Sequence, residues 1–245
     1  MTAEAASTAA VRAETLIDLG RHHEAVPLLE QALATRPDDV ELLDLLAQAQ
    51  LPIDARAAAE TAARLVADSP QRPRGHLLAS FAALDLGRRQ QAVAHAQRAV
   101  ELAPWDAIAH AQLAQSMATR GPLRRRRALK LARRAIDLAP ESSVGYVAAG
   151  NVELASGSAR RAEKWYRKAL ELHPTDGAAQ VNLAITDGRR GRLNSAYAGI
   201  LARLEADPSD EFALRLLDST LYRTIAHLQW IVLVLLYVVL AIKGG

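Results

Sequence analysis

The sequence predicts an all-α protein, a solenoid of about six helical hairpins followed by a capping helix that continues into a single transmembrane helix. Prolines recur at spacings of 33, 34, 36, 34 and 34 residues, and an alanine precedes each of them by twelve residues. A glycine lies seventeen residues before four of these prolines. The prolines are Pro37, Pro70, Pro104, Pro140, Pro174 and Pro208.

Each recurring residue type has a role in a helical hairpin. Glycine ends the first helix because it adopts the left-handed conformation without strain, and proline ends the second helix because it has no backbone N–H to donate. Small alanine side chains let the two helices approach closely. One hairpin cannot bury its own apolar face, whereas stacked hairpins share a continuous core.

This 34-residue pattern resembles the tetratricopeptide repeat family over residues 6–208. The resemblance implies a stack of paired helices in which the first helix of each hairpin lines an inner wall. It also implies that this wall holds peptides or helices of partner proteins.

The pattern predicts the helices of each hairpin in order. The first hairpin is expected to have helices over 6–19 and from residue 22 to about 35, and the second has Leu51 and Pro52 where a glycine would stand. The fourth hairpin gains two residues around positions 121–122. Nothing interrupts the array, so no domain boundary is expected before residue 209. In hairpins three to six the predicted first helices are 73–86, 107–120, 143–156 and 177–190, and the second helices are 88–102, 124–138, 158–172 and 192–206.

The last part of the chain predicts one long helix with two functions. Residues 209–224 form an amphipathic cap on the last hairpin, because three leucines share one face. Residues 225–242 carry no charge, and the stretch between Arg223 and Lys243 spans about 28 Å as a helix, close to the thickness of a membrane core. The capping leucines are Leu214, Leu217 and Leu221.

A second interpretation of residues 225–242 stays open, namely a buried helix or one that inserts into a partner chain. The segment is apolar on all sides, Trp230 and Tyr222 stand at one end as interfacial aromatics, and His227 and Gln229 fall where water is available. These features favour the membrane. The first residues show no secretory signal, so the solenoid is expected on the cytoplasmic side of a single-pass membrane protein.

The composition and the motifs of the chain argue against an enzymatic activity. The chain has no cysteine, which excludes disulfides and thiolate ligands or nucleophiles. Phosphate-binding loops, nucleophile elbows and dinucleotide fingerprints do not occur in it, and the run His22, His23, Glu24 lacks a second histidine four residues on. We therefore expect no enzymatic activity, no cofactor and no metal site.

The resemblance implies a partner groove along the inner wall. Its aliphatic side chains and amides suit an amphipathic helix or an extended peptide, and Asn182 stands where the family often has an asparagine that contacts the ligand backbone. The alternative is that apolar members such as Phe81 pack against the next hairpin. The basic clamp that the family uses for acidic peptides is not evident, because Glu14, Glu41 and Asp44 occupy the first two hairpins. The predicted groove consists of Leu77, Leu78, Phe81, Leu84, Gln112, Gln115, Val147, Asn151, Leu154, Asn182 and Ile185.

Arginines gather at the turns inside successive hairpins, and stacking is expected to align them along one edge. Several like charges at a helix start oppose the helix dipole, so local stability does not explain them. Anionic headgroups or an acidic protein, including another copy of this chain, would bind such an edge. Nucleic acid fits less well because no aromatics are interleaved, and a solvated edge without a partner is the remaining alternative. The basic edge consists of Arg88, Arg89, Arg124, Arg125, Arg126, Arg127, Arg160, Arg161, Arg189, Arg190 and Arg192.

Charge divides the chain. Residues 1–70 carry five arginines against twelve acids, a balance of −7, and residues 120–168 carry thirteen Lys and Arg against four acids, a balance of +9. Taken with the repeats and the apolar end, this predicts a membrane-tethered interaction scaffold that presents a groove to a partner protein at the cytoplasmic membrane face. The alternative is a soluble adaptor or regulator whose apolar C-terminal helix inserts into a partner subunit.

Overall fold

The computed structural model describes residues 3–119, 121–206, 213–214, 217–218 and 221. Within these ranges the chain forms twelve α-helices and so confirms the predicted helical solenoid. The helices are α1 Ala3–Asp18, α2 His22–Leu33, α3 Val40–Gln50, α4 Ala55–Asp68, α5 Pro73–Asp85, α6 Arg89–Leu102, α7 Ala107–Met117, α8 Pro122–Leu138, α9 Ser143–Ala155, α10 Ala159–Leu172, α11 Gly177–Arg189 and α12 Leu193–Ala206.

The start of most first helices is set by a side chain two residues after the repeat proline. Asp39, Asp106 and Asp176 each accept backbone N–H groups from the first turn, and Ser142 does the same for α9. Such caps satisfy donors that a helix leaves open at its N-terminus. The fixed distance from proline to cap therefore determines where these helices begin.

The end of the first helix requires glycine in four hairpins. Gly20, Gly87, Gly157 and Gly191 have φ of 73°, 72°, 85° and 75°, in the left-handed region. In the first hairpin the N–H of Arg21 donates to the Leu16 carbonyl at 2.8 Å and closes the helix. The second hairpin has no such glycine, and the Asp54 side chain instead caps α4 after a short turn.

Alanine occupies the closest contacts between the paired helices. The six alanines that precede the repeat prolines by twelve residues are almost completely buried, and all lie on second helices. At α9 and α10 the approach is closer still, because a Cβ on Gly150 would lie 2.3 Å from the Tyr166 ring. The six alanines are Ala25, Ala58, Ala92, Ala128, Ala162 and Ala196.

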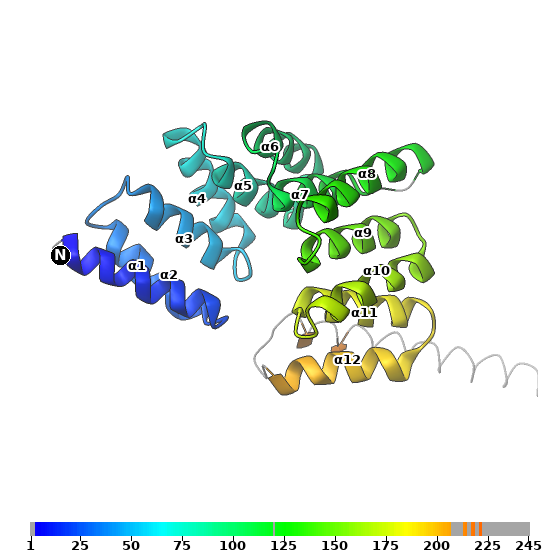
Figure 1. Ribbon diagram of the computed structural model, residues 1–245. Coiled ribbons are helices and arrows are strands. Elements are labelled where there is room, and N and C mark those ends of the chain that lie inside the picture. Colours follow the sequence, from blue (N-terminus) through cyan, green and yellow to red (C-terminus); the bar gives the residue numbers. More distant parts are fainter. Residues whose placement is uncertain (1–2, 120, 207–212, 215–216, 219–220, 222–245) are drawn as a thin grey trace, which may run out of the picture.

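Figure 1 shows the helices following one another in sequence order along an arch, with α1 and α2 at one end and α12 at the other. Consecutive first helices contact one another along the array, whereas no pair of second helices does so to a similar extent in the described part of the chain. The second helices are therefore spread on the outside of the curve. The first helices form its inner wall.

The fourth hairpin departs from the expected boundaries. α7 ends at Met117, three residues before the predicted end, and α8 begins at Pro122, two residues before its predicted start. Proline is favoured at the first position of a helix, which accounts for the earlier start. The result is a second helix of 17 residues, compared with 14 in α6 and α10.

The membrane segment predicted at 225–242 lies outside the described residues, as does most of the predicted cap at 209–224. Of the helices that the structure does describe, none combines the length and the apolar character needed to cross a membrane.

Candidate functional site

One row of half-buried side chains crosses the inner wall. Each member lies eleven residues after a repeat proline, so stacking of the hairpins brings the five positions into line. Three of them are amides and two are apolar, which repeats the mixture expected from the sequence. The row consists of Gln48, Phe81, Gln115, Asn151 and Ile185.

The predicted groove residues divide into two groups. Five of them are buried and pack within the array. The other six are half-buried and remain partly accessible, so the groove hypothesis depends on them. The buried group is Leu77, Leu78, Gln112, Val147 and Leu154. The accessible group is Phe81, Leu84, Gln115, Asn151, Asn182 and Ile185.

Gln112 is placed between hairpins by a buried polar network. Its side-chain N–H donates to the Ser80 hydroxyl at 3.0 Å, and that hydroxyl donates to the Ala92 carbonyl at 2.9 Å. Three helices, α5, α6 and α7, meet at this hydroxyl. Because a buried polar group must be hydrogen-bonded to avoid a large cost, the network fixes how the third and fourth hairpins stack.

Two of the accessible amides are already paired with each other. Asn151 donates to the Gln115 side-chain oxygen at 2.8 Å, and the Tyr166 hydroxyl donates to the Asn151 oxygen at 2.7 Å. Burial raises the pKa of the Tyr166 hydroxyl well above its ordinary value, so it stays a donor. In the described part of the chain the Asn182 side chain has no such partner, and its amide is available to a ligand backbone.

Several members of the basic edge join one hairpin to the next. Arg89 donates to the carbonyls of Ser116 and Ala118 at 2.9 Å and 2.7 Å, and so caps the end of α7 in the following hairpin. Arg189 donates to the Leu154 carbonyl of α9 at 3.3 Å. Carbonyls at a helix C-terminus lack partners within the helix, which is why arginine is stabilising there.

Glu153 is a buried carboxylate held by two members of the basic edge. Arg125 donates to it through two N–H groups at 2.9 Å and 2.7 Å, and Arg161 donates at 2.9 Å. Burial alone would raise the pKa of Glu153, but the two guanidinium groups outweigh that effect and hold the pKa below its ordinary value. This triad joins α8, α9 and α10.

Glu163 forms a second acidic centre farther along the same edge. It binds Arg192 at 2.9 Å, Arg167 at 2.8 Å and also Arg190. Arg192 in addition pairs with Asp187. The turn between α11 and α12 is therefore fastened to α10.

The remaining members of the basic edge are exposed. In the described ranges, none of their side chains forms an ion pair or a side-chain hydrogen bond. The arginines of the basic edge thus form two groups, one that binds partners in the array and one that is free in the described ranges. The sequence alone does not distinguish the two groups. The free group is Arg88, Arg124, Arg126, Arg127 and Arg160.

A recurring contact that sequence reasoning missed occurs six residues after the repeat proline. His76 and His110 lie 3.1 Å and 3.0 Å from the carbonyls of Pro70 and Pro104, Tyr146 donates to that of Pro140, and Gln180 to that of Pro174. Three different types of side chain thus make the same contact. The signal in the sequence is the shared spacing of six residues from the repeat proline. It is hard to recognise because the residue type at that position changes between hairpins.

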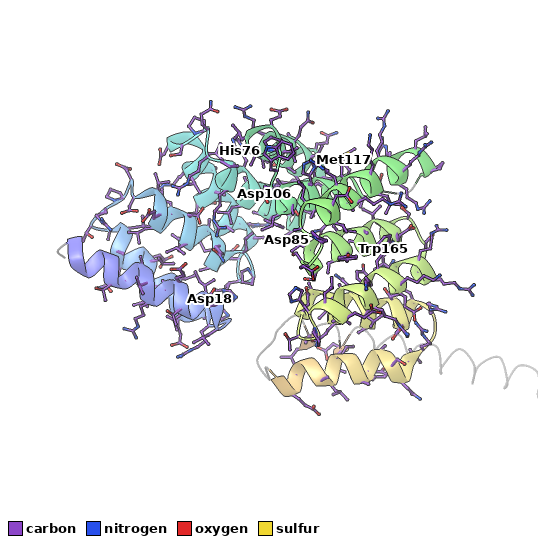
Figure 2. The ribbon with its side chains drawn as sticks, viewed as in Figure 1. Asp18, His76, Asp85, Asp106, Met117 and Trp165 are labelled. Carbon is purple, nitrogen blue, oxygen red and sulfur yellow. The ribbon has the colours of Figure 1, made fainter. Side chains whose placement is uncertain are left out.

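His76 also contacts its neighbour His95 on α6, with the two Nδ1 atoms 3.3 Å apart (Figure 2 labels His76). A carbonyl only accepts, so Nε2 of His76 carries a proton and donates to the Pro70 carbonyl. Burial, and secondly His76, lower the pKa of His95. No group of three or more metal-ligating side chains occurs among the described residues.

A hollow of about 450 Å³ lies between α1 and α3, near the start of α5. Val11, Leu42 and Leu45 supply apolar surface, and Glu14 and Glu41 supply carboxylates. Most of its lining belongs to the acidic segment 1–70 of the chain. The hollow is therefore opposite in charge to the basic edge.

The comparisons with known proteins agree with the helical-repeat architecture. The chain is an all-α helical-repeat solenoid. A family model described as tetratricopeptide repeat matches residues 6–49. No curated protein matches the chain in sequence.

Three solved structures illustrate the likeness. A tetratricopeptide repeat protein of Thermus thermophilus, TTC0263, is 25% identical with a TM-score of 0.50, over 89% of this chain and all 100% of its own. PilF of Pseudomonas aeruginosa is 13% identical with a TM-score of 0.55, over 88% of this chain and 98% of its own. A chain of the Cut9–Hcn1 assembly of the APC/C is 14% identical with a TM-score of 0.64, over 89% of this chain and 43% of its own.

The family model and these structures support the tetratricopeptide repeat family. Proteins of that family mediate protein–protein interactions, and the scaffold fold is generally non-enzymatic.

Proposed function

We propose that the protein is a membrane-tethered scaffold that presents the inner wall of its helical array to a partner protein at the cytoplasmic face of a membrane. The observation that carries the proposal is the half-buried row on the inner wall. Phe81 and Ile185 offer apolar surface there, and the amide of Asn182 has no partner in the described ranges. An amphipathic helix or an extended peptide would bury that surface and hydrogen-bond that amide.

Site-specific photo-crosslinking tests the groove. A photoreactive residue at Phe81 or at Ile185 is expected to form a defined adduct with a partner protein in intact cells. The control position is Lys164, which is exposed on the outer helix α10 and is expected to give no such adduct. Equal adducts from all three positions, or none from either inner position, would remove the groove from the proposal.

The tether rests on the uncharged segment 225–242 of the sequence. Extraction of membranes with alkaline carbonate is expected to leave the full-length chain in the lipid pellet. A variant with Leu235→Lys and Val238→Lys is expected to appear in the supernatant, since each lysine near the centre of a span costs about 3 kcal/mol. Release of the unmodified chain would favour the adaptor whose apolar helix inserts into a partner subunit.

A further inference from the structure

The first turn of α8 extends beyond the equivalent part of neighbouring second helices. α8 begins eighteen residues before its repeat proline Pro140, whereas α6 and α10 begin fifteen residues before theirs. Three extra helical residues add about 4.5 Å of length. Figure 1 shows this end of α8 at a free edge of the array.

This protruding turn, residues 122–127, combines an exposed leucine with unpaired charge. Leu123 is 76% exposed, and Arg124, Arg126 and Arg127 are exposed as well. In the part of the chain that the structure describes, these three arginines have no ion pair, in contrast to Arg125 beside them, which binds Glu153. Cations at a helix N-terminus are unfavourable, so nothing within the array accounts for them.

The hollow between α1 and α3 has the complementary composition. Val11, 62% exposed, and half-buried Leu45 line the hollow and offer apolar surface to a leucine side chain. Glu14 and Glu41 are exposed at its wall and have no ion pair among the described residues.

The other charged groups of the hollow are largely matched. Asp39 pairs with Arg36 at 3.0 Å, and Asp44 pairs with Arg74 at 2.5 Å. The second oxygen of Asp44 is buried and has no hydrogen-bond partner, which leaves acceptor capacity at the hollow. Arg72 is an exposed cation of the lining, and four acids against two arginines leave the lining negative.

We propose that the protruding turn of α8 docks into the hollow between α1 and α3 of a second copy of this chain. Leu123 then contacts Val11 and Leu45, and the free arginines pair with Glu14 and Glu41. The turn belongs to the fourth hairpin and the hollow to the first and second, and α8 makes no extensive contact with α1 or α3 within one described chain. The pairing is therefore between copies. It goes beyond the scaffold function and needs no other partner.

The symmetry of this contact has a consequence for assembly. The turn and the hollow are different surfaces, so each docked copy leaves one turn and one hollow free. Contacts of this kind build open chains unless a rotation closes a ring. The mass of the assembly is therefore expected to rise with protein concentration and to fall as salt screens the charges.

Sedimentation velocity on the full-length chain tests the proposal, with every sample in the same non-ionic detergent so that segment 225–242 is shielded equally. A hollow variant carries Glu14→Lys and Glu41→Lys, and a turn variant carries Arg124→Glu and Arg127→Glu. Each alone is expected to stay monomeric, with association weakened about tenfold or more. Mixed together they are expected to associate again, because the intact turn of the hollow variant fits the intact hollow of the turn variant.

Matched controls separate this contact from general charge effects. Arg160→Glu with Lys164→Glu changes charge as the turn variant does, at exposed positions of α10, and Glu30→Lys with Glu60→Lys matches the hollow variant at exposed positions of α2 and α4. Both controls are expected to associate like the unmodified chain. The proposal would be overturned if the unmodified chain were monomeric, if the controls lost association, or if the mixture failed to pair. Binding of the turn to vesicles of anionic lipid without any pairing between copies would overturn it as well.

Discussion

At the scale of single residues, Glu153 shows how an acid can decide the stacking of three helices. Its side chain is 3% exposed, while those of Arg125 and Arg161 are 30% and 54% exposed. Removing the carboxylate leaves two guanidinium groups that are able to regain water. The cost is therefore below that of breaking a fully buried pair, which reaches about 3–5 kcal/mol.

We expect Glu153→Gln to lower the free energy of unfolding by about 2 kcal/mol, measured by urea denaturation. The matched control is Glu171→Gln, whose ion pair with Lys168 is exposed on both sides and contributes little to stability because solvent screens it. Because the folded pKa of Glu153 lies below the ordinary 4.5, its contribution is complete above that pH and is lost as pH falls further. Equal effects of the two substitutions would contradict this account.

His95 predicts a second pH dependence at a higher range. Burial and His76 lower its pKa from the ordinary 6.5, so the unfolded chain binds the proton more readily than the folded chain. The free energy of unfolding should therefore decrease as pH falls from about 7 through the folded pKa of this residue. Thermal melts across that range should show a shallower decrease for His95→Gln than for the unmodified chain, although His22, whose pKa burial also lowers, retains part of the slope. An unchanged slope would contradict the contribution assigned to His95.

The sequence predicted structural residues better than it predicted accessible ones. The repeated alanines and glycines have one physical role each, so their spacing located the helices and turns. Leu77 and Val147 lie on the same helical stripe as accessible wall residues, and periodicity cannot tell a side chain that faces the next hairpin from one that faces a ligand. Arg125 and Arg126 are adjacent in sequence, yet Arg125 is paired with Glu153 and Arg126 is not. Glu153 lies 28 residues after Arg125, so local sequence does not reveal which of the two arginines is paired.

At the scale of helices, the closeness of α9 to α10 depends on Gly150. A Cβ there would lie 2.3 Å, 2.6 Å and 2.7 Å from three atoms of the Tyr166 ring. The ring is fully buried, and its hydroxyl is held by Asn151, so it has little freedom to move aside. Relief then requires the helices to separate.

We expect Gly150→Ala to lower the free energy of unfolding by about 3 kcal/mol, as overpacking of a core does. Gly188→Ala in α11 is the matched control, because its new Cβ would meet only the Ala196 Cβ at an ordinary 3.9 Å. Helix propensity favours that control by about 0.5–1 kcal/mol. Adding Tyr166→Leu to Gly150→Ala should recover part of the loss in chemical denaturation. An unchanged free energy of unfolding for Gly150→Ala would contradict this account, because it would mean that α9 and α10 can accommodate the added methyl group.

At the scale of the whole molecule, each described hairpin packs extensively against its immediate neighbours and against no other described hairpin. The consecutive helices from α1 to α12 pack in sequence order, so a disturbance spreads by steps along the array. α9 contributes nine buried residues and α11 four, which makes the sixth hairpin the less firmly packed of the two. Local opening is therefore expected to be more frequent in the sixth hairpin than in the fifth.

Amide hydrogen exchange followed by mass spectrometry measures this directly. In the unmodified chain, peptides of α11 and α12 should exchange faster than those of α5 to α10. In Gly150→Ala, exchange should accelerate in α9 and α10 and, through the lost neighbour, in α11 and α12, while α1 to α4 keep their rates because α5 to α8 lie between. Acceleration of all the described helices by the same factor would mean that the array opens as a single cooperative unit, and that neighbouring contacts do not set its stability.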